Sequence, residues 1–196
     1  MKTSSLVLTL ALGALSARAD ILVPVLVNTQ SLKGTTGFVD FQFDPGPISS
    51  QSATVKVEDF SGASYVAGSQ IDTGGASGGA LPSVVTLTNS TAYNDDYESV
   101  IFGGSMGFTL DFGGSAVSAQ NGKASSSSSF GFSLSDINGN PVLTKDPNGF
   151  DLTVELNTNC AVTLTTPSPD VTITPEPSSI LMMGGALLLF VFARYR

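Results

Sequence analysis

The sequence of 196 residues predicts an all-β protein, specifically an antiparallel β-sandwich for which a jelly-roll-like arrangement is one option. Three observations lead to this fold class. Many segments alternate apolar and polar residues with a period of two, tight-turn signals separate these segments, and no part of the body shows a helical apolar period. We expect eight to eleven short strands, all within one domain that spans residues 20–165.

The strand predictions come from two kinds of pattern. Alternating segments put every second side chain on one face of a strand, and β-branched segments favour extended backbone. A continuous apolar run at residues 21–27 predicts a strand that is buried on both faces. The other predicted strands are residues 39–43, 54–58, 84–88, 108–112, 130–134, 152–156 and 161–165.

The segments between the predicted strands carry turn residues. Asn-Gly pairs at 121–122, 138–139 and 148–149 accept the positive φ angles of tight hairpins. The glycine-rich residues 74–79 predict a flexible loop or a strand break. Residues 125–129 are five serines, which we interpret as a solvated edge strand leading into Phe130, with a linker as the alternative.

The composition excludes several classes of function. The chain has no His, no Trp and one Cys, and 16 acidic residues stand against 8 basic ones. Catalytic triads, Cys-His pairs and imidazole or zinc-cluster sites are therefore excluded, and an acidic chain is a poor partner for nucleic acid. We expect a protein that is not an enzyme and needs no cofactor, in which Cys160 is a small buried core residue.

The N-terminus has the layout of a secretory signal peptide. Lys2 precedes an apolar stretch at residues 6–15, and small residues Ala17 and Ala19 occupy the positions that a signal peptidase recognises. Export by a Sec-type machinery and cleavage after Ala19 are predicted. The mature chain then begins at Asp20, after a signal helix that spans residues 1–19.

The C-terminus has three parts in a fixed order. Pro175, Glu176 and Pro177 come first, an apolar run of 13 residues at 180–192 follows, and Arg194 and Arg196 end the chain. As a helix the run measures roughly 20 Å, which makes it a short transmembrane helix for a hydrocarbon core of about 30 Å. The arginines are expected on the cytoplasmic side. Residues 166–173 are interpreted as a Pro-rich linker.

This tail, residues 174–196, resembles the PEP-CTERM sorting signal of exported proteins in Gram-negative bacteria, many of which make exopolysaccharide. The resemblance implies that an exosortase recognises and processes the tail, so the protein is held transiently in the inner membrane and then reaches the cell surface. Parts of the body at residues 37–47, 86–94 and 136–142 also resemble an uncharacterised family of PEP-CTERM ectodomains, for which no catalytic residues are assigned. An ordinary C-terminal membrane anchor is the alternative for the tail.

Candidate sites in the body are weak. Asp95, Asp96 and Glu98 are interpreted as a solvated acidic loop, with a Ca²⁺ site or the paired carboxylates of a glycosidase as alternatives. Asp136 and Asn138 have the spacing of Ca²⁺ ligands, but a hairpin turn also explains them. Without Trp, a carbohydrate-stacking platform depends on the tyrosines Tyr65, Tyr93 and Tyr97.

Two main hypotheses of function follow. The first is a non-enzymatic exported surface or matrix protein, processed at its Pro-Glu-Pro tail and associated with exopolysaccharide or biofilm. The second is a carbohydrate- or calcium-binding adhesion module on the same β-sandwich. A glycosidase that uses two carboxylates is a third and weaker hypothesis.

Overall fold

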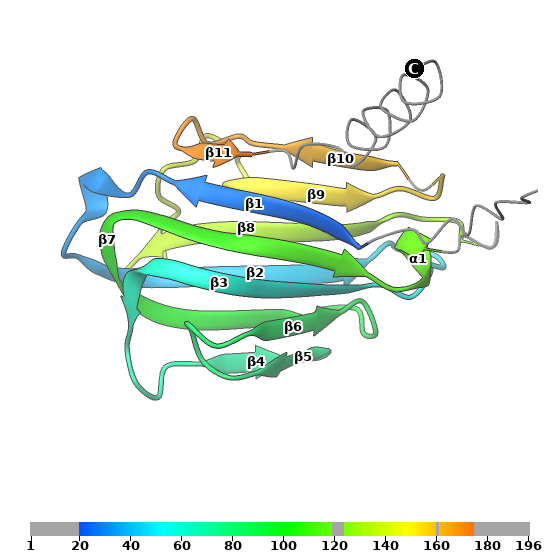
Figure 1. Ribbon diagram of the computed structural model, residues 1–196, viewed down its shortest axis with the longest axis horizontal. Helices are drawn as coiled ribbons and strands as arrows, with labels where there is room; N and C mark the ends of the chain where they lie inside the picture. The colour runs from blue at the N-terminus through cyan, green and yellow to red at the C-terminus, as the bar shows by residue number, and fades with distance from the viewer. Residues whose placement is uncertain (1–19, 119–123, 160, 175–196) are drawn as a thin grey trace, which may run out of the picture.

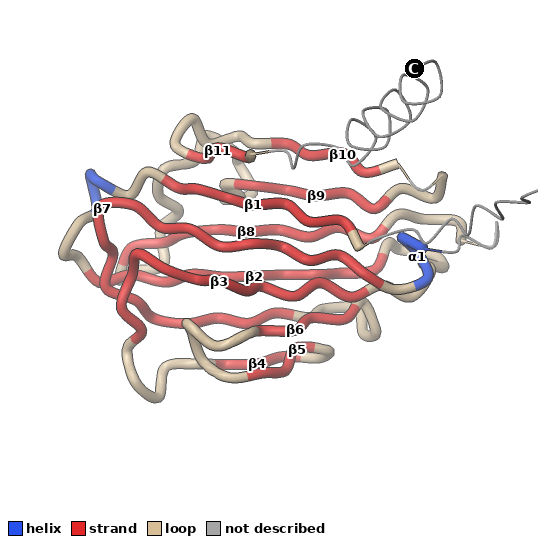
Figure 2. The backbone as a smooth tube through the Cα atoms, in the orientation of Figure 1, coloured by secondary structure: helices blue, strands red, loops and turns tan. Residues whose placement is uncertain are grey.

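The computed structural model describes residues 20–118, 124–159 and 161–174. These residues form mostly antiparallel β-strands, together with one short α-helix and one 3-10 turn (Figure 2). The all-β prediction is therefore confirmed. Several predicted features lie outside the described residues, namely the cleavage residues Ala17 and Ala19, Cys160, and the tail residues Pro175, Glu176, Pro177, Arg194 and Arg196.

Each of the eight segments predicted as strands overlaps an observed strand. Within the described residues the strands form an 11-stranded sheet. The elements in chain order are β1 (Ile21–Val27), η1 (Gln30–Leu32), β2 (Thr36–Pro45), β3 (Thr54–Tyr65), β4 (Ile71–Thr73), β5 (Ala76–Gly78), β6 (Val85–Thr88), β7 (Asp95–Gly113), α1 (Ser115–Ser118), β8 (Ser128–Asp136), β9 (Leu152–Leu156), β10 (Val162–Thr165) and β11 (Val171–Ile173).

The long strand β7 has two arms with different neighbours. Its first arm, residues 95–102, pairs with β2 on one side and with β4 and the end of β3 on the other. Its second arm, residues 106–113, pairs with β1 and with the rest of β3. Figure 1 shows β7 turning back at one end of the molecule, so that its arms lie in different parts of the sheet.

Glycines permit this turn. A Cβ atom at Gly103 would lie 1.9 Å from the carbonyl oxygen of Gly62, and Gly62 itself has a φ angle of 86°. The β3–β7 register also shifts on both sides of Ser61, which pairs with Gly107, while Ala63 pairs with Phe102; Gly62 therefore lies opposite residues 103–106. Both strands therefore bend at the same place, and only residues without a side chain fit there.

The bend divides the sheet into two halves. The β2 half contains β10, β9, β8, β2, the first arm of β7 and β4. The β1 half contains β11, β1, the second arm of β7, β3, β6 and β5. Phenylalanine rings join the halves. The ring centroid of Phe108, on the second arm, lies 5.4 Å from that of Phe41 on β2 and 4.9 Å from that of Phe132 on β8. Phenylalanines of both halves therefore belong to one hydrophobic core.

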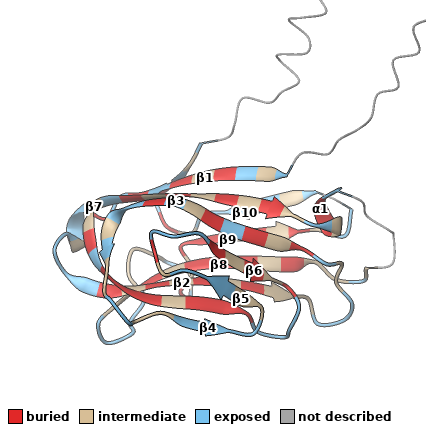
Figure 3. Ribbon diagram, turned by 60° about the horizontal axis from the view of Figure 1, so that its bottom comes forward, coloured by how far each residue is buried: buried red, intermediate tan, exposed pale blue. Residues whose placement is uncertain are grey.

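Two local expectations are wrong. The run Ile21–Val27 is buried on one face only, since Leu22 and Leu26 are 38% and 53% exposed; β1 has the core on one side and solvent on the other (Figure 3). The serine run does not form an edge strand, because β8 lies between β2 and β9. Ser128 is buried there and accepts a hydrogen bond from Asn89 Nδ2 at 2.7 Å.

The predicted linker at 166–173 is part of the folded body. Ser168 is buried and donates a hydrogen bond to the Leu143 carbonyl, and residues 171–173 form β11, which pairs with β1. Beyond this strand, Thr174 N donates to the Pro24 carbonyl at 3.1 Å. The β-branched residues Val171, Thr172 and Ile173 favour extended backbone, and their pairing satisfies backbone groups on the edge of β1.

We predict that Phe108→Ala lowers the free energy of unfolding by about 3–5 kcal/mol, because the ring lies between the two halves and its loss leaves a cavity. Urea denaturation followed by circular dichroism measures the change. The matched control is Leu26→Ala, at an exposed position on β1, which should cost less than about 1 kcal/mol. Equal losses for the two variants would contradict this view of the core.

Candidate functional site

The acidic segment is not a solvated loop. Asp95, Asp96 and Glu98 lie in the first arm of β7, and all three are buried. Their register decides their directions: Asp96 and Glu98 stand opposite Phe41 and Val39 on the inner face, whereas Asp95 stands opposite Gln42 on the outer face. The sequence pattern was misleading because the acidic residues interrupt the apolar alternation. Asp95 and Asp96 point away from each other and so do not form one metal site.

The inner carboxyl pair consists of Asp96 and Glu98, and the exposed Asp72 of β4 stands opposite Asp96. Both carboxylate oxygens of Glu98 accept hydrogen bonds from Leu81 N, at 3.1 and 3.0 Å. Gln70 Nε2 donates to Asp96 Oδ2 at 2.8 Å. Leu81 is itself buried, so the loop between β5 and β6 closes the core beneath this part of β7.

The pKa values of Asp96 and Glu98 are both raised. Burial, a hydrogen bond with Asp72 and the charge of Glu98 raise the pKa of Asp96 to about 8. Burial also raises the pKa of Glu98, although the Leu81 N–H partly offsets it. A protonated Asp96 can donate to a neighbouring carboxylate, which removes the repulsion between them. Among the residues that the structure describes, no three His, Cys, Asp or Glu side chains are arranged to hold a metal ion.

Asp136 and Asn138 form the hairpin turn that their sequence allows. Gly139, with a φ angle of 79°, donates its N–H to the Asp136 carbonyl at 3.0 Å. The Asp136 carboxylate accepts hydrogen bonds from the side chain of Asn140 and from the backbone of Asn138 and Asn140, and these bonds lower its pKa. Asp136 pairs with Gly37, at the opposite end of β2 from the residues that face Asp95. The four weak metal candidates are therefore not brought together.

The outer face of the β2 half carries a mixed aromatic and polar surface. Phe38 of β2 and Tyr97 of β7 stack with ring centroids 4.8 Å apart and planes 20° apart. Asp40 stands directly opposite Tyr97, and Gln42 Nε2 donates to Asp40 Oδ2 at 2.8 Å. Asp95 stands opposite Gln42. We call these five residues, Phe38, Asp40, Gln42, Asp95 and Tyr97, the outer patch.

Tyr93 and Phe150 border the outer patch. Tyr93 is 47% exposed, and its hydroxyl accepts a weak hydrogen bond from Gln42 at 3.4 Å and donates to Asp95. Phe150 covers Gly131, where an added Cβ would meet the ring at 2.4 Å, and Gly131 pairs with Gln42. Phe38 and Phe150 are not among the aromatic residues that the sequence indicated as a stacking platform. Only the strand register shows that Phe38 points outward.

Two oxygen atoms of the outer patch are buried without a hydrogen-bond partner, namely Asp40 Oδ1 and Asp95 Oδ1. Asp95 is 7% exposed as a whole residue. Burial, together with the charges of Asp95 and Asp44, raises the pKa of Asp40 to about 6, although its hydrogen bond from Gln42 lowers it. The patch therefore has spare capacity to accept hydrogen bonds.

The third tyrosine, Tyr65, lies apart from the outer patch at the end of β3. Its hydroxyl accepts a hydrogen bond from Gly68 N at 2.8 Å and so fixes the turn before β4. Of the three tyrosines considered as a stacking platform, the structure brings Tyr93 and Tyr97 to the same face.

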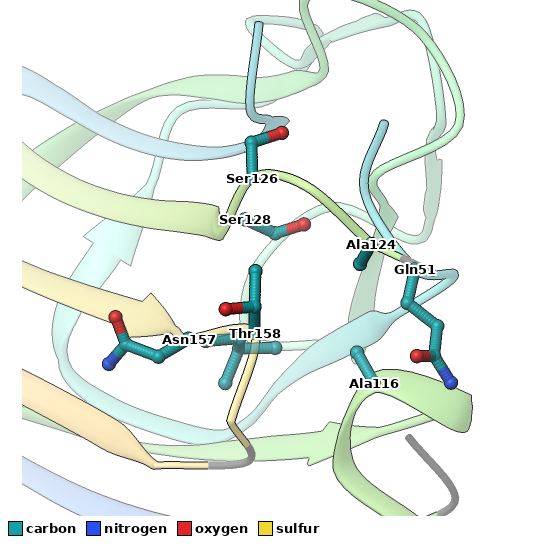
Figure 4. Close-up of a pocket in the computed structure, with 8 residues that line it drawn as sticks. Gln51, Ala116, Ala124, Ser126, Ser128, Asn157 and Thr158 are labelled. Atoms are coloured by element: carbon teal, nitrogen blue, oxygen red, sulfur yellow. The ribbon is translucent and has the colours of Figure 1, made fainter. Parts of the chain in front are cut away.

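A small hollow near Ser128, at the start of β8, is too small to hold a ligand. Its space is about that of one water molecule (Figure 4). The residues that line it are Gln51, Ala116, Ala124, Ser126, Ser128, Leu156, Asn157 and Thr158.

Comparisons with protein-family models, with curated proteins and with solved structures found no match for this chain. In the described part of the chain, no helix has the length and hydropathy needed to span a membrane.

The buried carboxyls predict that stability falls as pH rises. Asp40, Asp96 and Asp151 have pKa values raised to about 6, 8 and 7, mainly by burial. A folded state that holds protons more tightly than the unfolded state is most stable at low pH and loses that stability between about pH 4 and pH 8. We expect a higher melting temperature at pH 5 than at pH 8.

Asp96→Asn should reduce this pH dependence, because an amide keeps a hydrogen-bond donor without a titrating proton. The melting temperature at pH 8 should rise relative to the unmodified protein. Glu155→Gln removes the same charge from a half-buried position on β9 and serves as the control. If the slope of melting temperature against pH is unchanged in Asp96→Asn, the raised pKa of Asp96 does not contribute to the pH dependence of stability.

Proposed function

We propose that this chain is a non-enzymatic exported surface or matrix protein whose C-terminal tail is processed at Pro175, Glu176 and Pro177 by an exosortase. Its body is an antiparallel β-sandwich. A Sec-type machinery exports it, a C-terminal helix holds it transiently in the inner membrane, and the processed form resides at the cell surface in an exopolysaccharide layer or biofilm.

The observation that carries this proposal is the pairing of the first and last strands. β1 begins at Ile21, two residues after the predicted cleavage at Ala19, and β11 ends at Ile173, two residues before Pro175. Val25 pairs with Ile173 and Val27 with Val171. Both proposed cleavage positions therefore lie just outside the paired strands, and neither cut removes a strand from the sheet.

The sandwich within this proposal is supported by ring contacts between the two sheet halves. The ring centroid of Phe112, in the β1 half, lies 6.2 Å from that of Phe43 and 5.8 Å from that of Phe130, both in the β2 half. Rings at such separations on strands of both halves are typical of two layers packed face to face.

The charge of the processed form suits an extracellular protein. Removal of residues 1–19 and 178–196 takes away Lys2, Arg18, Arg194 and Arg196, which leaves four Lys against 16 acidic residues and a net charge of about −12. A chain so acidic is kept soluble by its own repulsion and avoids anionic surfaces at low salt.

Mass spectrometry of the protein recovered from the cell surface tests the proposal. We expect an N-terminus at Asp20 and a C-terminus that lacks Arg196, because both ends are removed during export. A variant in which Pro175, Glu176 and Pro177 are replaced by alanine should keep its tail and stay with the inner membrane.

The control for this experiment is the triple replacement of Ser125, Ser126 and Ser127 by alanine, within the body, which should be processed normally. An intact Arg196 in the surface form of the unmodified protein would exclude tail processing. An intact N-terminus would exclude signal cleavage.

A further inference from the structure

We infer that the outer patch of the β2 half binds an uncharged polysaccharide, with a pyranose ring stacked on the Phe38–Tyr97 pair and its hydroxyls hydrogen-bonded to Asp40 and Gln42. The inference rests on the proposed surface location for its biological setting, but the binding chemistry stands on the patch alone.

The aromatic pair supplies the stacking surface. Phe38 and Tyr97 lie on neighbouring antiparallel strands, and both rings are partly exposed although neither belongs to the core. The stacked rings stabilise the pairing of β2 with β7, and beside the carboxylates they also form a mixed apolar and polar surface. The C–H face of a sugar ring is apolar and its rim is polar, and it matches such a mixed surface.

The polar atoms beside the rings supply acceptors that the protein itself leaves unused. Five buried aspartate oxygens of the described residues have no hydrogen-bond partner, and two of them, Asp40 Oδ1 and Asp95 Oδ1, lie beside the aromatic pair. Asp95 is more than nine-tenths buried. A buried acceptor without a donor is costly, and sugar hydroxyls donate hydrogen bonds. The half-exposed Tyr93 donates to Asp95, so sugar hydroxyls reach that carboxylate by replacing the Tyr93 hydroxyl or through a bridging water.

The charge of the face selects the class of polysaccharide. Strands β2 and β8 and the first arm of β7 contain no Lys or Arg, whereas Asp40, Asp44 and Asp95 all lie on or beside the outer patch. A polymer rich in uronic acids or phosphate would be repelled, and so would nucleic acid. An uncharged polymer pays no such penalty, and its hydroxyls complement the carboxylates.

Affinity electrophoresis tests the inference with the exported protein as recovered from cells. Native gels contain dissolved hydroxyethylcellulose, dextran or galactomannan as uncharged probes, and alginate as the anionic probe. We expect at least one uncharged polymer to retard the protein and alginate to leave its mobility unchanged. Retardation by alginate alone, or by none of the four polymers, would overturn the inference.

Variants locate the binding face. Tyr97→Ala should weaken binding about tenfold, which is the loss expected for one stacking ring, whereas Tyr97→Phe keeps the ring and should bind nearly as the unmodified protein does. Asp40→Asn should weaken binding several-fold. The controls are Leu26→Ala and Glu58→Gln on the β1 half, which should change neither the affinity nor the preferred polymer.

The outcomes separate binding from folding and from export. Melting temperatures identify any variant that has lost its fold, and Tyr97→Phe keeps the test decisive if Tyr97→Ala is unfolded. Equal loss in Tyr97→Phe and Tyr97→Ala, or loss in the Leu26→Ala control, would overturn the stacking role. A patch that instead joins two copies of the chain, shown by a dimer that Tyr97→Ala dissociates and no polymer binds, would also overturn it. A trimmed tail without binding refutes only the patch, and binding with an intact tail refutes only the processing.

Discussion

The bend of β7 determines which strands belong to each half of the sheet. A single strand of 19 residues serves both halves of the sheet, so its turn at Gly103 sets where each half begins. The first arm fixes β2, and through β2 the strands β8, β9 and β10; the second arm fixes β1 and β3. If the turn moved by one residue, inward and outward side chains would exchange along one arm. Phe108 would leave the core if the second arm shifted, and Tyr97 would enter it if the first arm shifted.

Sequence patterns predicted the strands whose environment is simple. Residues 152–156 alternate cleanly because β9 has the core on one side and solvent on the other, and the prediction matches the observed strand. The first arm of β7 escaped prediction because Asp96 and Glu98 occupy inward positions, where an apolar residue is expected. Short strands such as β4 and β11 hold only three residues, too few for a period to show. The sequence indicated Tyr97 of the outer patch and the neighbouring Tyr93 as candidate stacking residues. The other residues of the patch come together only through the register between β2 and β7.

Buried carboxyl groups lie on both faces of the pair formed by β2 and the first arm of β7. On the inner face, Gln70 donates to Asp96 and Leu81 N donates to Glu98, and burial raises the pKa of Asp96 to about 8. On the outer face, Gln42 donates to Asp40. Each face keeps a carboxylate oxygen without a partner, namely Asp96 Oδ1 on the inner face and Asp40 Oδ1 and Asp95 Oδ1 on the outer face. The outer face differs in having an aromatic pair, Phe38 and Tyr97, beside its carboxyl groups.

The pairing of β1 with β11 joins segments about as far apart in the chain as the body allows, since Leu26 meets Thr172. Such a long loop is slow to close, because its entropy is lost before the contacts form. If the chain crosses a membrane from its N-terminus, as we propose, β1 emerges first and its edge stays unpaired until residues 171–173 have also crossed. Under that proposal, the sheet is completed only when nearly the whole body has been translocated.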